Sequence, residues 1–105
     1  MTQTAFTVDC GSGDTRYRVR FVTEKGTIQE FLVQLEFRIG DEWRPVIRYD
    51  TAHGYAHCDR YEPDGTVTPH QALAFPDYNQ ALTFVLGEVK NRWTELIRPF
   101  QESSP

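Results

Sequence analysis

Alternation of apolar and polar residues is the strongest pattern in the first half of the chain. From Arg16 onward, every second residue is apolar and the residues between are mostly charged, which is typical of a β-strand with one covered face. The longest run extends from Phe31 to Ile39. The segments 24–26 and 40–42 interrupt the alternation with Gly and charged residues. These breaks predict turns that join antiparallel strands.

The first turn also predicts a register. A three-residue loop over residues 24–26 pairs Thr23 with Thr27 and places Arg20 opposite Glu30. This register keeps apolar residues opposite apolar residues, as a half-buried antiparallel pair requires.

A second predicted turn spans residues 51–54. A four-residue loop there pairs Asp50 with Tyr55 and Arg48 with His57. The apolar face becomes inconsistent farther along the chain, because Tyr61 and Val67 fall on the polar side, and a bulge near Asp59 restores it.

The last quarter of the chain changes to a helical period. Asp77 is the expected N-cap, with Gln80 three residues later as in a capping box. Pro99 is expected to end the helix near Arg98. The apolar positions that follow helical spacing are Leu82, Val85, Leu86, Val89, Trp93, Leu96, Ile97 and Phe100.

Together these patterns predict an α+β fold in a single domain over residues 1–105. The expected architecture is an antiparallel β-meander of about four to five strands with one long C-terminal helix packed on one face. Residues 1–14 are predicted to be a weakly ordered segment with a short edge strand over residues 5–8, and residues 101–105 a tail.

Composition narrows the functional classes. The chain of 105 residues has a formal net charge of -4, which argues against a generic basic nucleic-acid binder but not against a local basic patch. Cys10 and Cys58 lie outside any zinc-type spacing, and no signal peptide precedes them, so we expect reduced thiols and a cytoplasmic protein. No apolar run is long enough for a membrane span.

Ionisable side chains are densest between Arg48 and Arg60. Asp50, His53, His57 and Asp59 fall within ten positions, and such groups can share acid–base chemistry or hold a divalent metal. The alternative interpretation is structural, with Asp50 accepting turn amides and His57 bonding across the sheet. We predict that His57 or His53 lies within hydrogen-bonding reach of Asp50 or Asp59, on the sheet face away from the helix.

A set of arginines is predicted on that same face. This face binds phosphate or RNA in one interpretation, and forms cross-strand ion pairs with Glu30 and Glu36 in the other. The arginines are Arg16, Arg18, Arg20, Arg38, Arg44 and Arg48.

The chain resembles a prokaryotic domain of unknown function marked by an RYDTAHG motif. The resemblance rests on the strand from Phe31, on residues 48–54, on the turn at Pro63-Asp64-Gly65 and on the helix from Phe75 to Trp93. It covers most of the chain between Phe31 and Phe100.

The chain is also similar, more distantly, to TumE-type toxins of toxin–antitoxin pairs. Arg48, Tyr49, Asp50, His53 and His57 follow the arginine–aromatic–aspartate motif and histidines of those toxins, with Thr51 in place of an asparagine.

This second resemblance implies a domain that acts on RNA or a nucleotide. Arg48 would hold phosphate, His53 or His57 would transfer a proton, and Asp50 would orient the imidazole. The catalytic candidates are therefore Arg48, Asp50, His53 and His57, with no cofactor and no metal assigned. The alternatives are a non-catalytic module that binds a protein partner or a second copy of itself, and a metal site at Asp50, His53, His57 and Asp59.

Overall fold

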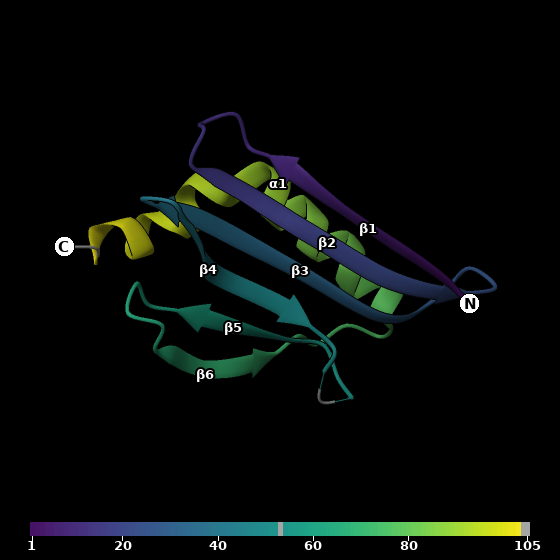
Figure 1. Ribbon diagram of the computed structural model, residues 1–105. Helices are drawn as coiled ribbons and strands as arrows, with labels where there is room; N and C mark the ends of the chain where they lie inside the picture. The colour runs from purple at the N-terminus through teal and green to yellow at the C-terminus, as the bar shows by residue number, and fades with distance from the viewer. Residues whose placement is uncertain (53, 104–105) are drawn as a thin grey trace.

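A computed structural model describes residues 1–52 and 54–103 of the protein. In this part of the chain, six strands form one antiparallel sheet and one helix follows them (Figure 1). The strands are β1 (Thr2–Asp9), β2 (Thr15–Glu24), β3 (Thr27–Ile39), β4 (Glu42–Asp50), β5 (His57–Tyr61) and β6 (Val67–Ala72). The helix α1 spans Tyr78–Glu102.

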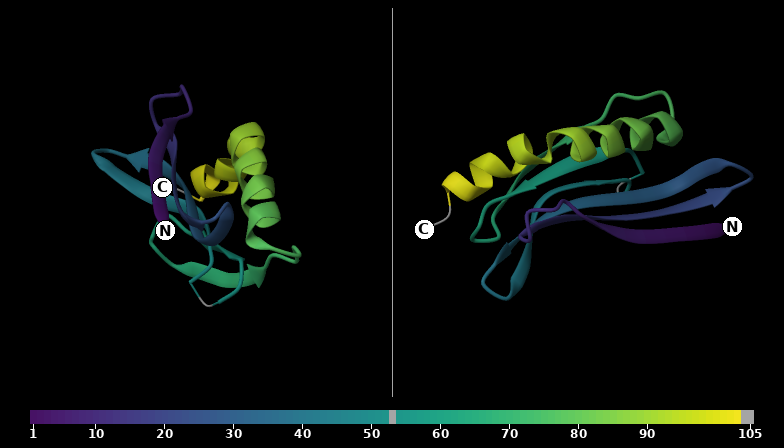
Figure 2. Two further views of the ribbon diagram at one scale, coloured as in Figure 1. Left: turned by 90° about the vertical axis from the view of Figure 1, so that its right-hand side faces the viewer. Right: turned by 90° about the horizontal axis from the view of Figure 1, so that it is seen from above.

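The sheet is a meander in which each strand pairs with the next strand in the chain. Helix α1 lies across one face of it, against β3 and β4 (Figure 2). This arrangement confirms the α+β class and the single C-terminal helix. There are six strands rather than four to five, because both ends of the sheet form full edge strands. One of these is β1, which pairs with β2 from Thr2 to Asp9 within the segment expected to be weakly ordered.

The core lies between α1 and the sheet face that it covers. Alternate residues of β2, β3 and β4 are less than a tenth exposed there, which matches their apolar spacing in the sequence. The largest of these buried side chains are Val19, Phe31, Val33, Leu35 and Ile47 from the sheet and Val85 and Val89 from the helix. None of the described residues forms a helix with the length and hydropathy needed to cross a bilayer.

The predicted β2–β3 register was wrong. Glu24 pairs with Thr27 across a two-residue turn, in which Lys25 (φ 52°) and Gly26 (φ 79°) both adopt positive φ, as a type I′ hairpin turn requires. Arg20 pairs with Leu32 rather than with Glu30, because the shorter turn shifts the register by one residue and a bulge between Val22 and Thr23 shifts it by one more. The apolar alternation survives because the shift is by an even number of residues.

The predicted β4–β5 register was also wrong. Asp50 pairs with His57, so the connecting loop holds residues 51–56. The loop is two residues longer than predicted, and its first residue, Thr51, bonds back to β3, where its Oγ1 accepts a hydrogen bond from the backbone N–H of Phe31 at 3.2 Å. The β5–β6 register does shift between Cys58 and Arg60, near the predicted bulge, but the extra residue lies on β6, so Tyr61 stays on the same face as Asp59.

Helix α1 begins as predicted and ends later than predicted. Asp77 is the N-cap, and its Oδ1 accepts a hydrogen bond from the Gln80 N–H at 2.8 Å. Pro99 lies inside the helix, which continues to Glu102 and takes in the first residues of the expected tail. The last turn is held by burial of Phe100, whose ring meets that of Phe37 edge-on with centroids 6.1 Å apart. A kink at Arg92 (φ -129°, ψ 18°) bends the helix before this turn.

Candidate functional site

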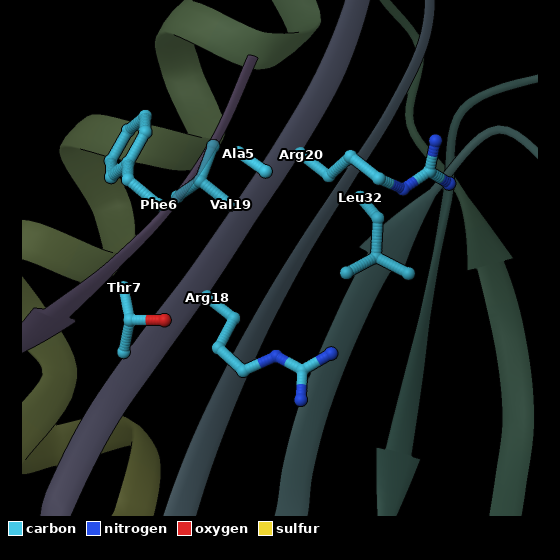
Figure 3. A pocket seen from close by; sticks show the side chains of 7 residues that line it. All are labelled: Ala5, Phe6, Thr7, Arg18, Val19, Arg20 and Leu32. Atoms are coloured by element: carbon cyan, nitrogen blue, oxygen red, sulfur yellow. The ribbon is translucent and has the colours of Figure 1, made fainter. Parts of the chain in front are cut away.

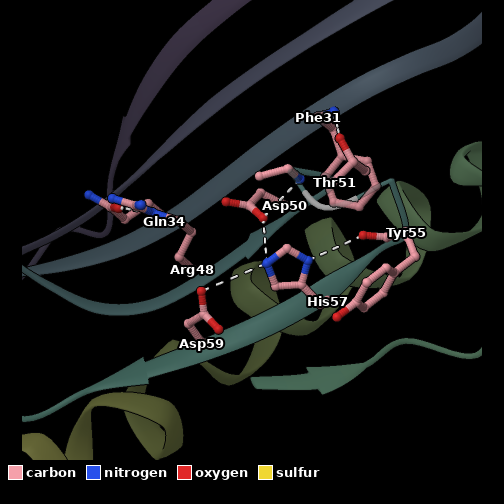
Figure 4. A network of polar contacts seen from close by, with 9 residues as sticks. Phe31, Gln34, Arg48, Asp50, Thr51, Tyr55, His57 and Asp59 are labelled. Carbon is pink, nitrogen blue, oxygen red and sulfur yellow. Dashed lines mark hydrogen bonds and ion pairs between the residues drawn. The ribbon is translucent and has the colours of Figure 1, made fainter. Parts of the chain in front are cut away.

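Two rows of side chains cross the sheet on the face away from α1, here called the open face. The rows follow from the strand pairing, because directly paired residues point to the same side of a sheet. The first row is Thr7, Arg18, Gln34, Arg48 and Asp59. The second row is Ala5, Arg20, Leu32, Asp50 and His57. Figure 3 shows the β1–β3 end of these rows, and Figure 4 the β3–β5 end.

The imidazole of His57 lies between two carboxylates, those of Asp50 and Asp59. Its Nε2 is 2.8 Å from Oδ1 of Asp50 and 3.8 Å from Oδ2 of Asp59 (Figure 4). The His57 side chain is 1% exposed, whereas those of Asp50 and Asp59 are 12% and 20% exposed. The predicted contact between His57 and Asp50 is therefore confirmed.

The hydrogen bond at the other ring nitrogen of His57 determines whether the imidazole can accept a proton. Nδ1 lies 3.2 Å from the backbone carbonyl oxygen of Tyr55. That carbonyl and the Asp50 carboxylate are both acceptors, so both hydrogen bonds form together only when His57 is the doubly protonated imidazolium. An imidazolium has no lone pair with which to accept a proton, so this geometry disfavours a general base.

The loop after β4 is held by the same carboxylate. Oδ1 of Asp50 accepts a hydrogen bond from the Ala52 N–H at 3.3 Å, and Gly54 N–H donates to the Thr51 carbonyl at 3.1 Å. These bonds are the turn interactions that the structural interpretation of Asp50 predicted. His53 lies in this loop, outside the described residues.

Arg48 points away from His57, towards β3. Its Nε donates to Oε1 of Gln34 at 2.7 Å, and its guanidinium lies 5.6 Å from the centre of the Tyr61 ring. Gln34 in turn donates to Oε2 of buried Glu36, whose Oε1 accepts a hydrogen bond from Nε of Arg16 at 2.7 Å. The structure thus joins Asp50, His57 and Asp59, and places Arg48 in a separate neighbouring network.

Tyr61 is a further residue of the site, which the sequence pattern does not single out as a candidate. The alternation placed Tyr61 on the polar side, which looked like an error in the face assignment. The ring does lie on the open face, where Arg48 covers it. An aromatic residue at a position expected to be polar is therefore the feature of the sequence that could have identified Tyr61 as part of the site.

Metal binding and thiol chemistry find little support in the described residues. Within residues 1–52 and 54–103, no group of three or more His, Cys, Asp or Glu side chains is arranged to hold a metal ion. Cys10 and Cys58 are both free thiols, as predicted. Burial raises the pKa of the Cys58 thiol, with Arg60 opposing and Asp59 adding to the shift, so its nucleophilic thiolate is scarce at neutral pH.

Comparison with known proteins places the chain in a family. No curated protein and no solved structure gave a match. A family profile does match, and it covers residues 1–104, nearly the whole chain. The chain therefore belongs to the family described as "Domain of unknown function (DUF7718)".

Proposed function

We propose that the domain acts on RNA or a nucleotide through its open face, with Arg48 as the residue that binds phosphate. The observation that carries this proposal is that the groups in contact with Arg48 are uncharged, although Asp59 is its cross-strand neighbour. Within the described residues, its contacts are the Gln34 amide and the Tyr61 ring, and no carboxylate forms an ion pair with it. Arg16, Arg18 and Arg20 on the same face each pair with a glutamate, as the ion-pair interpretation expected.

Arg48 retains the donors that phosphate recognition needs. A guanidinium carries five N–H groups in a planar fork, and only Nε is used by Gln34. The two terminal nitrogens remain for a phosphate, which arginine binds in a bidentate manner. The neighbouring Tyr61 ring offers a surface on which a base can stack. Similarity to TumE-type toxins implies the same ligand class.

Asp50 and His57 act as positioning residues in this proposal. Their contact fixes the end of β4 and the start of β5, the two strands that carry Arg48 and Tyr61. His57 is too buried to touch a ligand. His53, the other histidine implied by the resemblance, lies outside the described residues.

Arg48→Gln tests this function. We expect the variant to bind a single-stranded RNA of mixed sequence about 10–100-fold more weakly than wild type, because a charge-assisted hydrogen bond contributes about 1.5–3 kcal/mol. The slope of log K against log salt should fall by about 0.7 for the lost phosphate contact. Fluorescence anisotropy measures both, and a denaturing gel of the same samples detects any cleavage.

Arg60→Gln is the matched control. Arg60 is exposed on β5 and alternates to the opposite face from Asp59 and Tyr61, so its loss should leave RNA affinity within about twofold of wild type. Equal affinity of wild type and Arg48→Gln for RNA would contradict the proposed role of Arg48.

A second candidate function, self-association, is favoured by the contrast between the two edges of the sheet. The β6 edge contains Pro69, which has no amide donor, and an irregular register, both of which discourage strand addition. The β1 edge is eight residues long, has Asp9 as its one charged residue and exposes Phe6. Long uncharged edges are templates for pairing with another strand.

Phe6→Lys should prevent such pairing between two copies of β1. If the domain dimerises through this edge, the charge placed on each strand lowers the dimer affinity, because two lysines meet near the two-fold axis. Analytical ultracentrifugation of both proteins measures the change. Val67→Lys, at an exposed position of the β6 edge, is the control and should associate like wild type. A wild-type protein that is monomeric at high concentration would rule out this candidate.

A further inference from the structure

We infer that Arg18 and Arg20 form a phosphate-binding clamp on the open face, a second subsite beside Arg48. This inference rests on the proposed function and identifies a ligand group for a part of the face not yet assigned. The two side chains border a recess of about 300 Å³ (Figure 3). The recess is lined by Ala5, Phe6, Thr7, Arg18, Val19, Arg20 and Leu32.

The recess forms where the short side chains of β1 lie beside the long arginine side chains of β2. Ala5 is paired with Arg20, and Thr7 with Arg18, so each arginine has a small neighbour on the edge strand. Figure 3 shows the Arg18 and Arg20 side chains extending across β3 with Leu32 between them. The result is an apolar floor with a guanidinium on each side.

Both arginines have charge to offer to a ligand. The Arg18 side chain is 53% exposed, and its Nη1 lies 3.9 Å from Oε2 of Glu36, a carboxylate already bonded to Arg16 and Gln34. Arg20 lies 3.2 Å from Glu30, and both of these side chains are about half exposed. The Arg20–Glu30 pair is exposed, and such pairs contribute only about 0–1 kcal/mol, so a phosphate can replace Glu30 as the partner of Arg20. Glu36 is buried, and its contact with Arg18 is a long one, so Arg18 can bind a phosphate in addition to it.

A third carboxylate near the clamp, that of Asp50, is already held by a partner of its own. Asp50 pairs with Leu32, the floor of the recess, and its carboxylate would repel an anion. That carboxylate is bound by His57 at 2.8 Å. The contact with His57 therefore holds this carboxylate on the β4–β5 side of Leu32, away from the arginines of β2.

The spacing suits a phosphate shared by two arginines. Arg18 and Arg20 are two residues apart on one strand, so their Cα atoms are separated by about 6.7 Å and their side chains leave on the same face. Arg48 is two strands away from Arg18 in the same row, about 10 Å across the sheet. One nucleotide can thus place its phosphate in the clamp while the adjoining phosphate of an RNA strand reaches Arg48.

Two single variants, Arg18→Gln and Arg20→Gln, test the clamp. Inorganic phosphate and adenosine monophosphate are titrated into each protein and followed by NMR shifts of the arginine Nε–H groups. We expect each variant to bind both probes at least tenfold more weakly than wild type, with thermal melting unchanged because both side chains are exposed. Arg38→Gln removes an exposed charge from β3 outside the recess and should bind like wild type.

The same titrations with Arg48→Gln separate this inference from the proposed function. If the clamp is correct, Arg48→Gln retains the phosphate-induced shifts of the Arg18 and Arg20 Nε–H groups, whatever happens to binding at position 48. Normal phosphate binding by both Arg18→Gln and Arg20→Gln would overturn the clamp, whatever the RNA result. Loss of phosphate binding in those two variants, with RNA affinity unaffected by Arg48→Gln, would support the clamp and refute the role proposed for Arg48.

Discussion

Replacing His57 by alanine is expected to lower the free energy of unfolding by about 3 kcal/mol, because it removes the buried hydrogen-bond partner of the Asp50 carboxylate and leaves a cavity. His57 is 1% exposed and contacts two carboxylates. Without the imidazole, the mostly buried Asp50 carboxylate loses its hydrogen-bond partner and faces a cavity the size of the lost ring. Urea denaturation followed by circular dichroism measures the change.

Asp59→Asn provides the comparison for this variant. Asp59 lies 3.8 Å from Nε2 of His57 and is more exposed than Asp50, so its substitution should cost much less than that of His57. A double-mutant cycle of His57→Ala with Asp50→Ala should yield a coupling energy of about 0.5–3 kcal/mol. Independent, additive effects of the two substitutions would show that the pair does not form.

Phe31→Ala should destabilise the protein by about 3–5 kcal/mol, as expected for removal of a buried aromatic side chain. Phe31 is 1% exposed, and its ring meets that of Tyr78 edge-on with centroids 6.1 Å apart. This contact joins β3 to the first turn of α1, so its loss weakens both the core and the docking of the helix. Thermal and urea denaturation give the size of the effect.

Phe84→Ala is the matched control, since it removes the same side chain from an exposed position. Phe84 is 45% exposed and contacts the ring of Phe75 at 5.1 Å between centroids. We expect a loss below about 1 kcal/mol, as for most surface substitutions. Similar losses for Phe31→Ala and Phe84→Ala would mean that Phe31 does not face the core.

The class of fold could be predicted from the sequence because it depends on periodicity. The alternation from Phe31 to Ile39 and the helical spacing after Asp77 are properties of single segments. The register of paired strands depends on the geometry of the turn between them. The turn at Lys25-Gly26 has a positive φ at Lys25, and nothing in the sequence indicates that a lysine will adopt this conformation. The continuation of α1 past Pro99 depends on burial of Phe100 against Phe37, a tertiary contact.

Part of the candidate site could also be predicted from the sequence. The contact between Asp50 and His57 could be predicted because both residues fall at the ends of adjoining strands around a short loop. The orientation of Arg48 could not, because its side chain can reach either neighbouring strand. Gln34 decides the outcome by accepting its Nε–H. The recess beside Arg18 depends on the pairing of β1, whose weak apolar pattern gave no register.

The meander has a consequence for how the chain is made by a ribosome. All six strands precede α1, and each can pair with its predecessor as soon as it emerges. Val33, Leu35 and Ile47, which α1 will cover, remain uncovered until the last quarter of the chain has been synthesised. Nascent chains that stop before Tyr78 therefore present a sheet with one bare apolar face, a surface that chaperones bind and that promotes aggregation.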